Sequence, residues 1–103
     1  MRVFFTISMA TDAANEKARR GELGSTIQSI LEETKPEAVY FGADNGMRTA
    51  FMVVDMKDAS QIPIICEPWF LAFDAEVEGQ VVMVPEDLMA AGPGIEAAVN
   101  KFG

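Results

Sequence analysis

The chain opens with residues that alternate in the way a β-strand requires. Val3, Phe5 and Ile7 fall on one side of such a strand. Phe4 falls on the other side, so large apolar residues occur on both. The pattern therefore predicts a strand over residues 2–8 that is covered on both faces.

Helical spacing replaces this alternation further along. One apolar stripe recurs at the spacing of a helix, at Leu23, Ile27, Ile30 and Leu31. The stripe predicts a helix that ends near Thr34, before a Lys-Pro pair, with Thr11 or Asp12 as its amino-terminal cap. Two glycines within residues 21–24 predict a kink or a break, so this stretch is either one bent helix or two helices.

A β-hairpin is the next expected element. Residues 38–41 and 49–54 are rich in β-branched and aromatic side chains, which favour strands. Between them lies Asp44-Asn45-Gly46, a sequence that tolerates the positive φ angles of a tight turn. The two strands should therefore pair directly with each other.

A second helix is expected from about Ala59, with Asp58 and Gln61 placed to cap its first turn. The apolar residues that we expect to point inward are Ile62, Ile65 and Phe70. Pro68 removes a hydrogen bond from the helix interior, so a kink or a split is expected before Trp69.

The carboxy-terminal part predicts one more strand and a helical tail. Residues 77–84 have strand character, and a proline followed by two acids at residues 85–87 is typical of a helix start. Gly92-Pro93-Gly94 should break that helix before a last turn at residues 95–102. The order of elements predicts an α+β, ferredoxin-like split βαβ fold, with a four-stranded antiparallel sheet, both long helices on one face and a helical tail.

Length, composition and charge narrow the function classes. The 103 residues, 50% of them hydrophobic, suffice for a single domain over residues 1–103. The 16 acidic and 8 basic residues give a net charge of −8, which argues against nucleic acid and membrane surfaces as partners. No apolar run approaches the roughly 20 residues of a membrane span, and no signal-peptide cleavage site is evident, so a soluble, cytoplasmic protein is expected.

Histidine is absent and cysteine occurs once. These counts exclude catalysis by histidine with serine or cysteine, histidine-ligated metals and an intrachain disulfide. A single thiol cannot build a thiolate cage either, so we expect no metal and no cofactor. We expect the one thiol, Cys66, to be buried and inert, because the adjacent Glu67 disfavours a thiolate.

Both faces of the predicted sheet are apolar. The alternating positions on the two faces are Val3, Val39 and Val81 on one, and Phe4, Tyr40 and Val82 on the other. Helices on one face leave the other uncovered, so a lone domain would expose a large apolar patch. The simplest cover is a second copy of the chain, which predicts a homodimer through the sheet face.

Five short phrases of the sequence carry a resemblance to known proteins. They are Lys35-Pro36-Glu37-Ala38-Val39-Tyr40-Phe41, Val53-Val54-Asp55-Met56, Ile62-Pro63, Glu67-Pro68-Trp69-Phe70 and Pro85-Glu86-Asp87-Leu88. Over nearly its whole length the chain resembles small bacterial proteins of the dimeric α/β-barrel type, mostly of unknown function. The resemblance implies that two four-stranded sheets pair into one barrel, in a class that includes cofactor-free monooxygenases, muconolactone isomerase-like enzymes and plain ligand binders. Some relatives carry a pantothenate synthetase label, but this chain has no Gly-rich loop for the phosphates of ATP.

The candidate ligand pocket is centred on Glu67-Pro68-Trp69-Phe70. A carboxylate beside a rigid kink and two aromatic rings resembles the floor of a small-molecule pocket. Tyr40 and Arg48, from the hairpin, could add a phenol and a guanidinium for an anionic substrate. The alternative is that Trp69 packs in the core and Glu67 is solvated. Tyr40 and Arg48 would then be ordinary residues of the hairpin surface.

Two functions follow from these residues. One is a non-catalytic homodimer that binds a small molecule or serves as a structural module. The alternative is a cofactor-independent oxygenase or isomerase acting on a small organic molecule, with Glu67 as general base or acid and Tyr40 or Arg48 polarising the substrate. Catalysis requires these groups to converge on one cavity with Trp69, whereas packing does not.

Overall fold

Four antiparallel strands form one open sheet in the order β2-β3-β1-β4 in the computed structural model, which describes all 103 residues. The strands are β1 (Arg2–Ser8), β2 (Ala38–Asp44), β3 (Met47–Asp55) and β4 (Glu76–Val82). The helices are α1 (Thr11–Arg19), α2 (Leu23–Thr34), α3 (Gln61–Phe73), α4 (Pro85–Ala90) and α5 (Gly92–Phe102). This order confirms the predicted α+β class and its four-stranded antiparallel sheet, and it is consistent with a ferredoxin-like fold.

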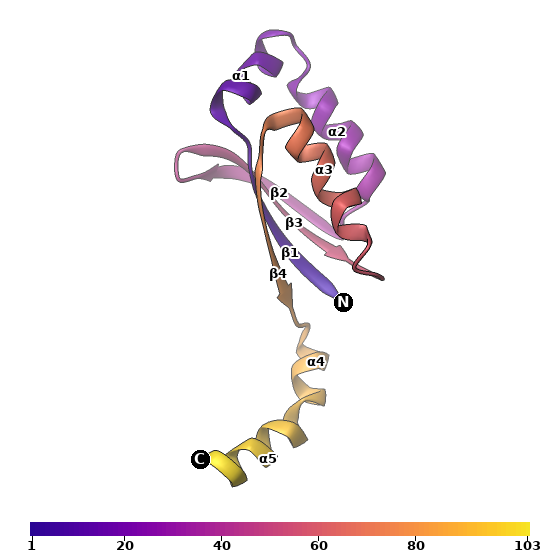
Figure 1. The fold of residues 1–103 in the computed structure, drawn as a ribbon, viewed down its shortest axis with the longest axis vertical. Helices are drawn as coiled ribbons and strands as arrows, with labels where there is room; N and C mark the ends of the chain where they lie inside the picture. Colours follow the sequence, from indigo (N-terminus) through magenta and orange to yellow (C-terminus); the bar gives the residue numbers. More distant parts are fainter.

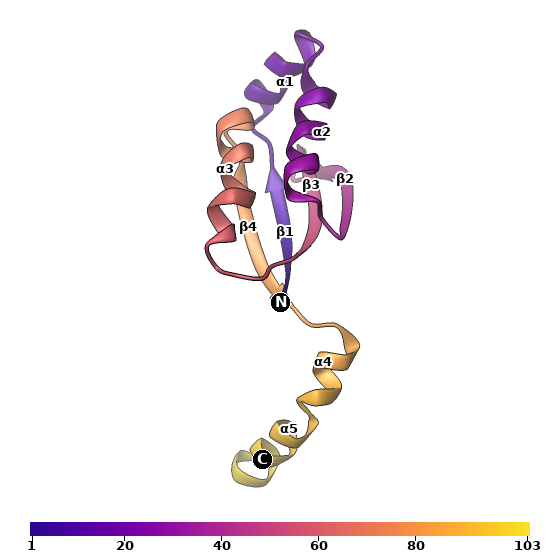
Figure 2. The same ribbon diagram turned by 90° about the vertical axis from the view of Figure 1, so that its right-hand side faces the viewer.

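The helices divide into two groups. Figure 1 shows α1, α2 and α3 on one side of the sheet, while the opposite side carries no helix. Figure 2, turned by 90°, shows α4 and α5 leading away from the rest of the molecule beyond the end of β4. None of the five helices combines the length and apolar character needed to cross a membrane.

Strand register decides which residues form the core. Phe5 of β1 lies opposite Met52 of β3 and Gly79 of β4, so these three positions share the face beneath the helices. Trp69 and Phe73 of α3 are fully buried against that face, with ring centroids 6.0 Å apart. The core therefore lies between the three helices and one face of the sheet, as the alternation in the sequence predicts.

The stretch predicted as one bent helix or two helices forms two, α1 and α2. Gly21 lies between them with a φ of 70°, in the left-handed region that glycine adopts at little cost. The prediction that Thr11 or Asp12 caps the first helix is wrong, because the N-cap is Ala10 and no side chain caps it. The Asp12 carboxylate instead accepts a hydrogen bond from the N–H of Ala13, one residue along.

The hairpin matches its prediction. Asn45 and Gly46 have φ angles of 51° and 75°, so both central residues of the turn are left-handed, as in a type I′ turn. The strands that it joins pair in antiparallel register from Ala38 opposite Val53 to Asp44 opposite Met47.

α3 differs in part from its prediction. It begins at Gln61 rather than Ala59, and Pro68 does not split it. Ile65, Trp69 and Phe73 are four residues apart and buried, and this stripe holds both halves of the helix against the sheet. The expectation that Ile62 and Phe70 point inward is wrong, since they are 48% and 39% exposed at the edge of the stripe.

The prediction that Asp58 caps α3 is wrong, because the N-cap is Ser60 and no side chain caps it, but the polar side chains predicted there hold the turn before the helix. Gln61 Oε1 accepts hydrogen bonds from the backbone N–H groups of Lys57 (2.6 Å) and Asp58 (3.1 Å). The Asp58 carboxylate accepts one from the N–H of Ser60 at 2.8 Å, and this bond holds the pKa of Asp58 below its ordinary value. Asp58 therefore acts in the turn that leads into the helix.

The carboxy-terminal segment keeps its predicted elements with shifted limits. β4 ends at Val82, and α4 begins at Pro85, as the sequence indicates. The prediction that Gly92-Pro93-Gly94 breaks the helix is only partly right, because these residues form the first turn of α5 and the interruption lies at Ala91. Proline suits a first turn, where its missing N–H has no helical partner to lose.

Candidate functional site

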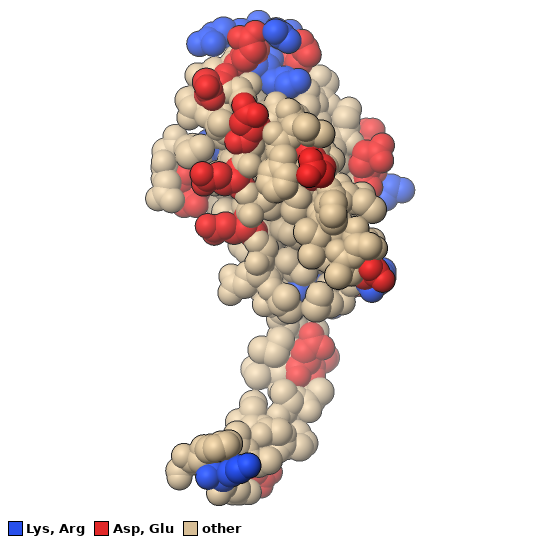
Figure 3. Space-filling view, in the orientation of Figure 1, with Lys and Arg blue, Asp and Glu red and all other residues tan.

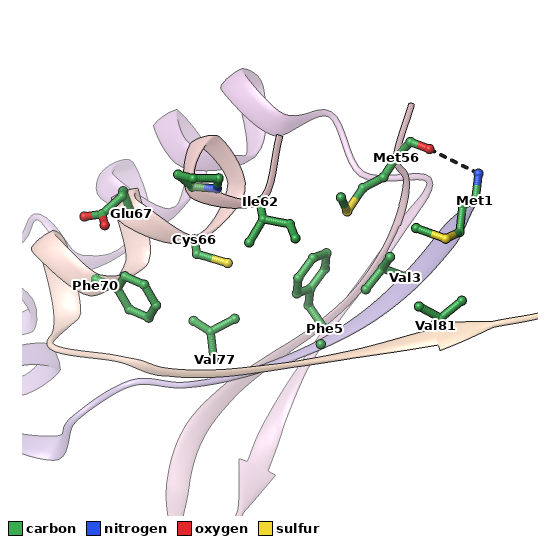
Figure 4. Close-up of a pocket in the computed structure, with 12 residues that line it drawn as sticks. Met1, Val3, Phe5, Met56, Ile62, Cys66, Glu67, Phe70, Val77 and Val81 are labelled. Atoms are coloured by element: carbon green, nitrogen blue, oxygen red, sulfur yellow. Dashed lines mark hydrogen bonds between the residues drawn. The ribbon is translucent and has the colours of Figure 1, made fainter. Parts of the chain in front are cut away.

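A cleft opens between α3 and the edge of the sheet formed by β1 and β4 (Figure 4). It has a volume of about 490 Å³ and is lined by 12 residues, nine of them hydrophobic. The side chains that define its shape are Phe5, Ile62, Cys66, Phe70, Val77 and Val81. We call this site the cleft.

Gly79 makes the floor of the cleft possible. It lies in β4 between Val77 and Val81 and directly opposite Phe5. A Cβ added at Gly79 would approach Phe5 Cε1 to 3.1 Å, tighter than most real Cβ contacts, so the Phe5 ring packs directly against the β4 backbone. A side chain at this position would push that ring or fill the hollow above it.

The mouth of the cleft is apolar and exposed. Ile62, Phe70 and Val81 lie along it and are 48%, 39% and 63% exposed, and we call these three residues the rim. Typical sites for small molecules bury most of the ligand surface. The cleft is open along its mouth, so a molecule bound in it would remain partly exposed to water on this side. The cleft of one chain is thus an incomplete enclosure.

Two adjacent titratable residues, Cys66 and Glu67, lie in the cleft wall. Burial raises the pKa of the Cys66 thiol, and the charge of Glu67 raises it further, so the thiol stays protonated. The Glu67 carboxylate has no hydrogen bond or ion pair within the chain. Figure 4 shows the Cys66 sulfur and the Glu67 carboxylate pointing in opposite directions, so the two cannot act as a pair.

The structure does not bring the other predicted pocket residues to Glu67. Tyr40 is 72% exposed on the uncovered face of the sheet. Arg48 Nη1 donates a 2.8 Å hydrogen bond to Asn15 Oδ1, and Arg48 lines a separate hollow. Trp69 is fully buried in the core and does not line the cleft. Of the four residues, Glu67 alone lines the cleft, where its side chain is exposed at the margin and its carboxylate points away from the apolar interior (Figure 4).

The Trp69 environment has one irregular feature. Its indole N–H is buried and has no hydrogen-bond acceptor. Leaving such a donor unpaired costs about 1–3 kcal/mol, which the packing of the large ring must exceed. Trp69 is therefore placed for packing rather than for contact with a ligand.

Sequence reasoning missed most of the cleft. Its lining from β1 and β4, such as Val77 and Gly79, has no chemistry that would mark it in the sequence. One signal was present, because an isolated glycine inside a strand pattern indicates a close approach by another group. The lone Gly79 between alternating strand residues fits that description.

Charged groups elsewhere form ordinary surface pairs. Arg2 Nε donates to Glu37 at 2.9 Å, and this hydrogen bond raises the pKa of Arg2. Lys57 Nζ donates to Asp55 at 2.9 Å, and together with the amino-terminal ammonium it lowers the pKa of Asp55 to about 2. No three His, Cys, Asp or Glu side chains gather in a way that could hold a metal ion.

Comparison with known proteins adds no assignment: no protein-family model matches the chain, and no curated protein is significantly similar to it. The features of the molecule that bear on its function are the cleft, the uncovered sheet face and the carboxy-terminal helices.

Proposed function

We propose that the protein is a non-catalytic homodimer that binds a small, largely apolar molecule in the cleft. The observation that carries this proposal is the lining, in which nine of 12 residues are hydrophobic around a volume of about 490 Å³. Small-molecule sites have volumes of roughly 300–1,000 Å³ and combine apolar walls with few polar groups. The cleft meets both criteria.

The polar chemistry of the cleft favours binding over catalysis. An active site needs an acid, a base or a nucleophile together with a group that stabilises developing charge. Here the Cys66 thiol is held protonated by its raised pKa, and the Glu67 carboxylate stands alone. A single carboxylate at the edge of an apolar cleft suits a ligand with an apolar body and one hydrogen-bond-donating or cationic group.

The second copy of the chain is argued from the uncovered sheet face. Phe4 and Phe51 stack there with ring centroids 6.3 Å apart, and Tyr40 lies opposite Phe51 on the neighbouring strand. Charged residues frame this apolar centre, including the Arg2–Glu37 pair. An apolar centre with a polar frame is the anatomy of a protein interface, and pairing of two such faces would give the α/β barrel that the sequence resemblance implies.

The ligand proposal is tested with Nile red, a neutral apolar dye whose fluorescence rises in apolar surroundings. Wild type is compared with Ile62→Glu in the rim and with Ile64→Glu as a matched control. Ile64 is 63% exposed on the same helix but does not line the cleft. We expect wild type and Ile64→Glu to bind the dye equally and Ile62→Glu to bind at least about tenfold more weakly, since its carboxylate would be desolvated by the dye. Equal binding by all three proteins, or none by wild type, would refute the proposal.

The dimer proposal is tested by light scattering on two variants. They replace adjacent residues of β2 that face opposite sides of the sheet. Tyr40→Glu places a charge on the uncovered face, whereas Phe41→Glu places it on the helix side, where Phe41 is 53% exposed. We expect wild type and Phe41→Glu to have twice the chain mass of 11.2 kDa, and Tyr40→Glu to shift toward the monomer. A monomeric wild type, or a Tyr40→Glu dimer as stable as wild type, contradicts this interface.

A further inference from the structure

The carboxy-terminal helices α4 and α5, here called the arm, have no partner within their own chain. Every residue from 85 to 103 is exposed. The arm nevertheless carries large apolar residues, which we call the arm stripe: Leu88, Ile95, Val99 and Phe102. Isolated helices shorter than about 12–15 residues are marginal in water, so the 11 residues of α5 need tertiary contacts to remain helical. The arm must therefore pack against something that this chain alone does not supply.

The start of the arm is held in a fixed direction. The Asp87 carboxylate accepts a 3.1 Å hydrogen bond from the backbone N–H of Val84, and the N–H of Asp87 donates to the carbonyl of Val84 at 3.0 Å. Val84 is extended, and Pro85, the first residue of α4, has little freedom in φ. Figures 1 and 2 show that this turn sends the arm away from the sheet and the other helices. The geometry therefore favours contact with another molecule over return to the same chain.

The charge of the arm argues against a membrane as that other molecule. Helices that lie on anionic membranes carry lysine and arginine on their polar face. The arm has three acidic residues, Glu86, Asp87 and Glu96, and one basic residue, Lys101. Figure 3 shows the densest group of basic side chains at the end of the molecule opposite the arm, with acidic side chains among them, and further basic side chains scattered over the surface. An anionic lipid surface would repel the arm.

The cleft complements the arm in size and polarity. The 13 residues of α3 and the 11 residues of α5 span about 20 Å and 17 Å at a helical rise of about 1.5 Å per residue. α5 is therefore long enough to run along most of the cleft mouth. The rim is apolar, exposed and uncovered, as is the arm stripe.

The charges also match one to one. Glu67 has the only charged side chain of the cleft lining, which also includes Met1 with its amino-terminal ammonium paired to Asp55, and Lys101 is the only cation of the arm. Neither forms an ion pair within the chain, and the Lys101 ammonium lies 5.3 Å from the centre of the adjacent Phe102 ring. Opposite single charges on two unpartnered apolar surfaces fix the orientation in which those surfaces meet.

We propose that the arm of each chain packs over the cleft of a second copy, with the arm stripe on the rim and Lys101 beside Glu67. The exchanged arm closes the open side of the cleft, so the enclosure is complete only in the dimer. Binding of a ligand in the cleft is then coupled to dimerisation, because each binding site takes its wall from one chain and its cover from the other. This inference shares the cleft and the second copy with the proposed function but does not require a ligand.

Disulfide trapping between two populations tests the exchange. In a Cys66→Ala background, one population carries Phe70→Cys in the rim and a nitrogen-15-labelled population carries Val99→Cys in the arm. The two are mixed, allowed to exchange and mildly oxidised. We expect a covalent dimer whose disulfide, identified by mass spectrometry, joins a labelled to an unlabelled peptide. Repeating the experiment with Ile62→Cys as the rim cysteine samples a second position along the cleft.

Leu71→Cys provides the matched control, because Leu71 follows Phe70 and is 80% exposed but does not line the cleft. We expect it to give at least several-fold less mixed disulfide than either rim cysteine. Lys101→Glu in the arm population should lower the trapped yield, and Glu67→Lys in the other population should restore it.

Three results overturn the exchange: no mixed disulfide from either rim position, an equal yield from Leu71→Cys, or an intrachain disulfide when both cysteines are on one chain. The outcome is independent of ligand binding. A trapped dimer that binds no Nile red would refute the proposed function but not the exchange of arms. Dye binding without disulfide trapping would refute the exchange but not the binding of a ligand in the cleft.

Discussion

Replacement of Trp69 tests whether this residue packs in the core or forms the wall of a pocket, which is the role that the sequence suggested for it. Trp69 is fully buried, and a tryptophan buries about 150–250 Å². At about 25 cal/mol per Å² that area corresponds to about 4–6 kcal/mol of transfer free energy. Trp69→Ala should therefore lower the free energy of unfolding by about 3–5 kcal/mol, a large part of the roughly 5–15 kcal/mol that holds a domain folded.

Trp69→Phe is the informative companion. It keeps an aromatic ring near Phe73 and removes the indole N–H that has no acceptor. Because an unpaired buried donor costs about 1–3 kcal/mol, its removal offsets much of the lost packing. We expect a net loss of about 1–2 kcal/mol, clearly smaller than that of the alanine variant.

The assay is urea unfolding followed by far-ultraviolet circular dichroism, with Nile red binding measured on the folded variants. Trp69→Phe should bind the dye as wild type does, since Trp69 does not line the cleft. An alanine variant that loses less than about 1 kcal/mol would refute burial of Trp69 in the core. A phenylalanine variant as unstable as the alanine variant would refute the unpaired indole.

Other properties are open to direct measurement. Lys57 and the amino-terminal ammonium depress the folded-state pKa of Asp55 from 3.8 to about 2, so the resulting stabilisation is present above pH 4 and is lost as pH falls toward 2. Asp55→Asn should remove that part of the acid dependence in melts between pH 2 and 5. Because burial raises its pKa, the Cys66 thiol should react with a disulfide reagent at neutral pH far more slowly in the folded protein than in urea, and equal rates would contradict its burial. Gly46→Ala forces a side chain into a φ of 75° and should cost about 1 kcal/mol in urea unfolding, whereas Gly94→Ala, in open space in the first turn of α5, should cost nothing.

Features that depend only on neighbouring residues could be predicted from the amino-acid sequence. The alternation in residues 2–8 predicts the two faces of β1, and Asn45-Gly46 predicts the hairpin turn. The break around Gly21 is likewise local, since it depends on a backbone angle that glycine adopts readily. The order of these strands and helices along the chain then predicts the fold class without any knowledge of distant contacts.

The positions of the candidate site residues depend instead on how the helices and strands pack together. Glu67 and Trp69 are close in sequence, but a helix turns by about 100° per residue, so packing of α3 sends Trp69 into the core and leaves Glu67 at the cleft. The sequence left the position of Tyr40 equally open. Pairing of β2 with β3 decides it, because this register places Tyr40 on the uncovered face of the sheet, away from α3.

The cleft and the arm depend on contacts between segments far apart in the chain. The cleft exists because α3 packs beside β4 without covering Val81, and because Gly79 leaves room above Phe5. Nothing in the local pattern of either segment specifies that gap. The sequence predicts that the arm is helical, but its lack of a partner within the chain is visible only once the turn at Val84 has directed it away from the sheet. Periodicity specifies which side of an element is apolar, whereas tertiary packing decides which of those sides remain uncovered.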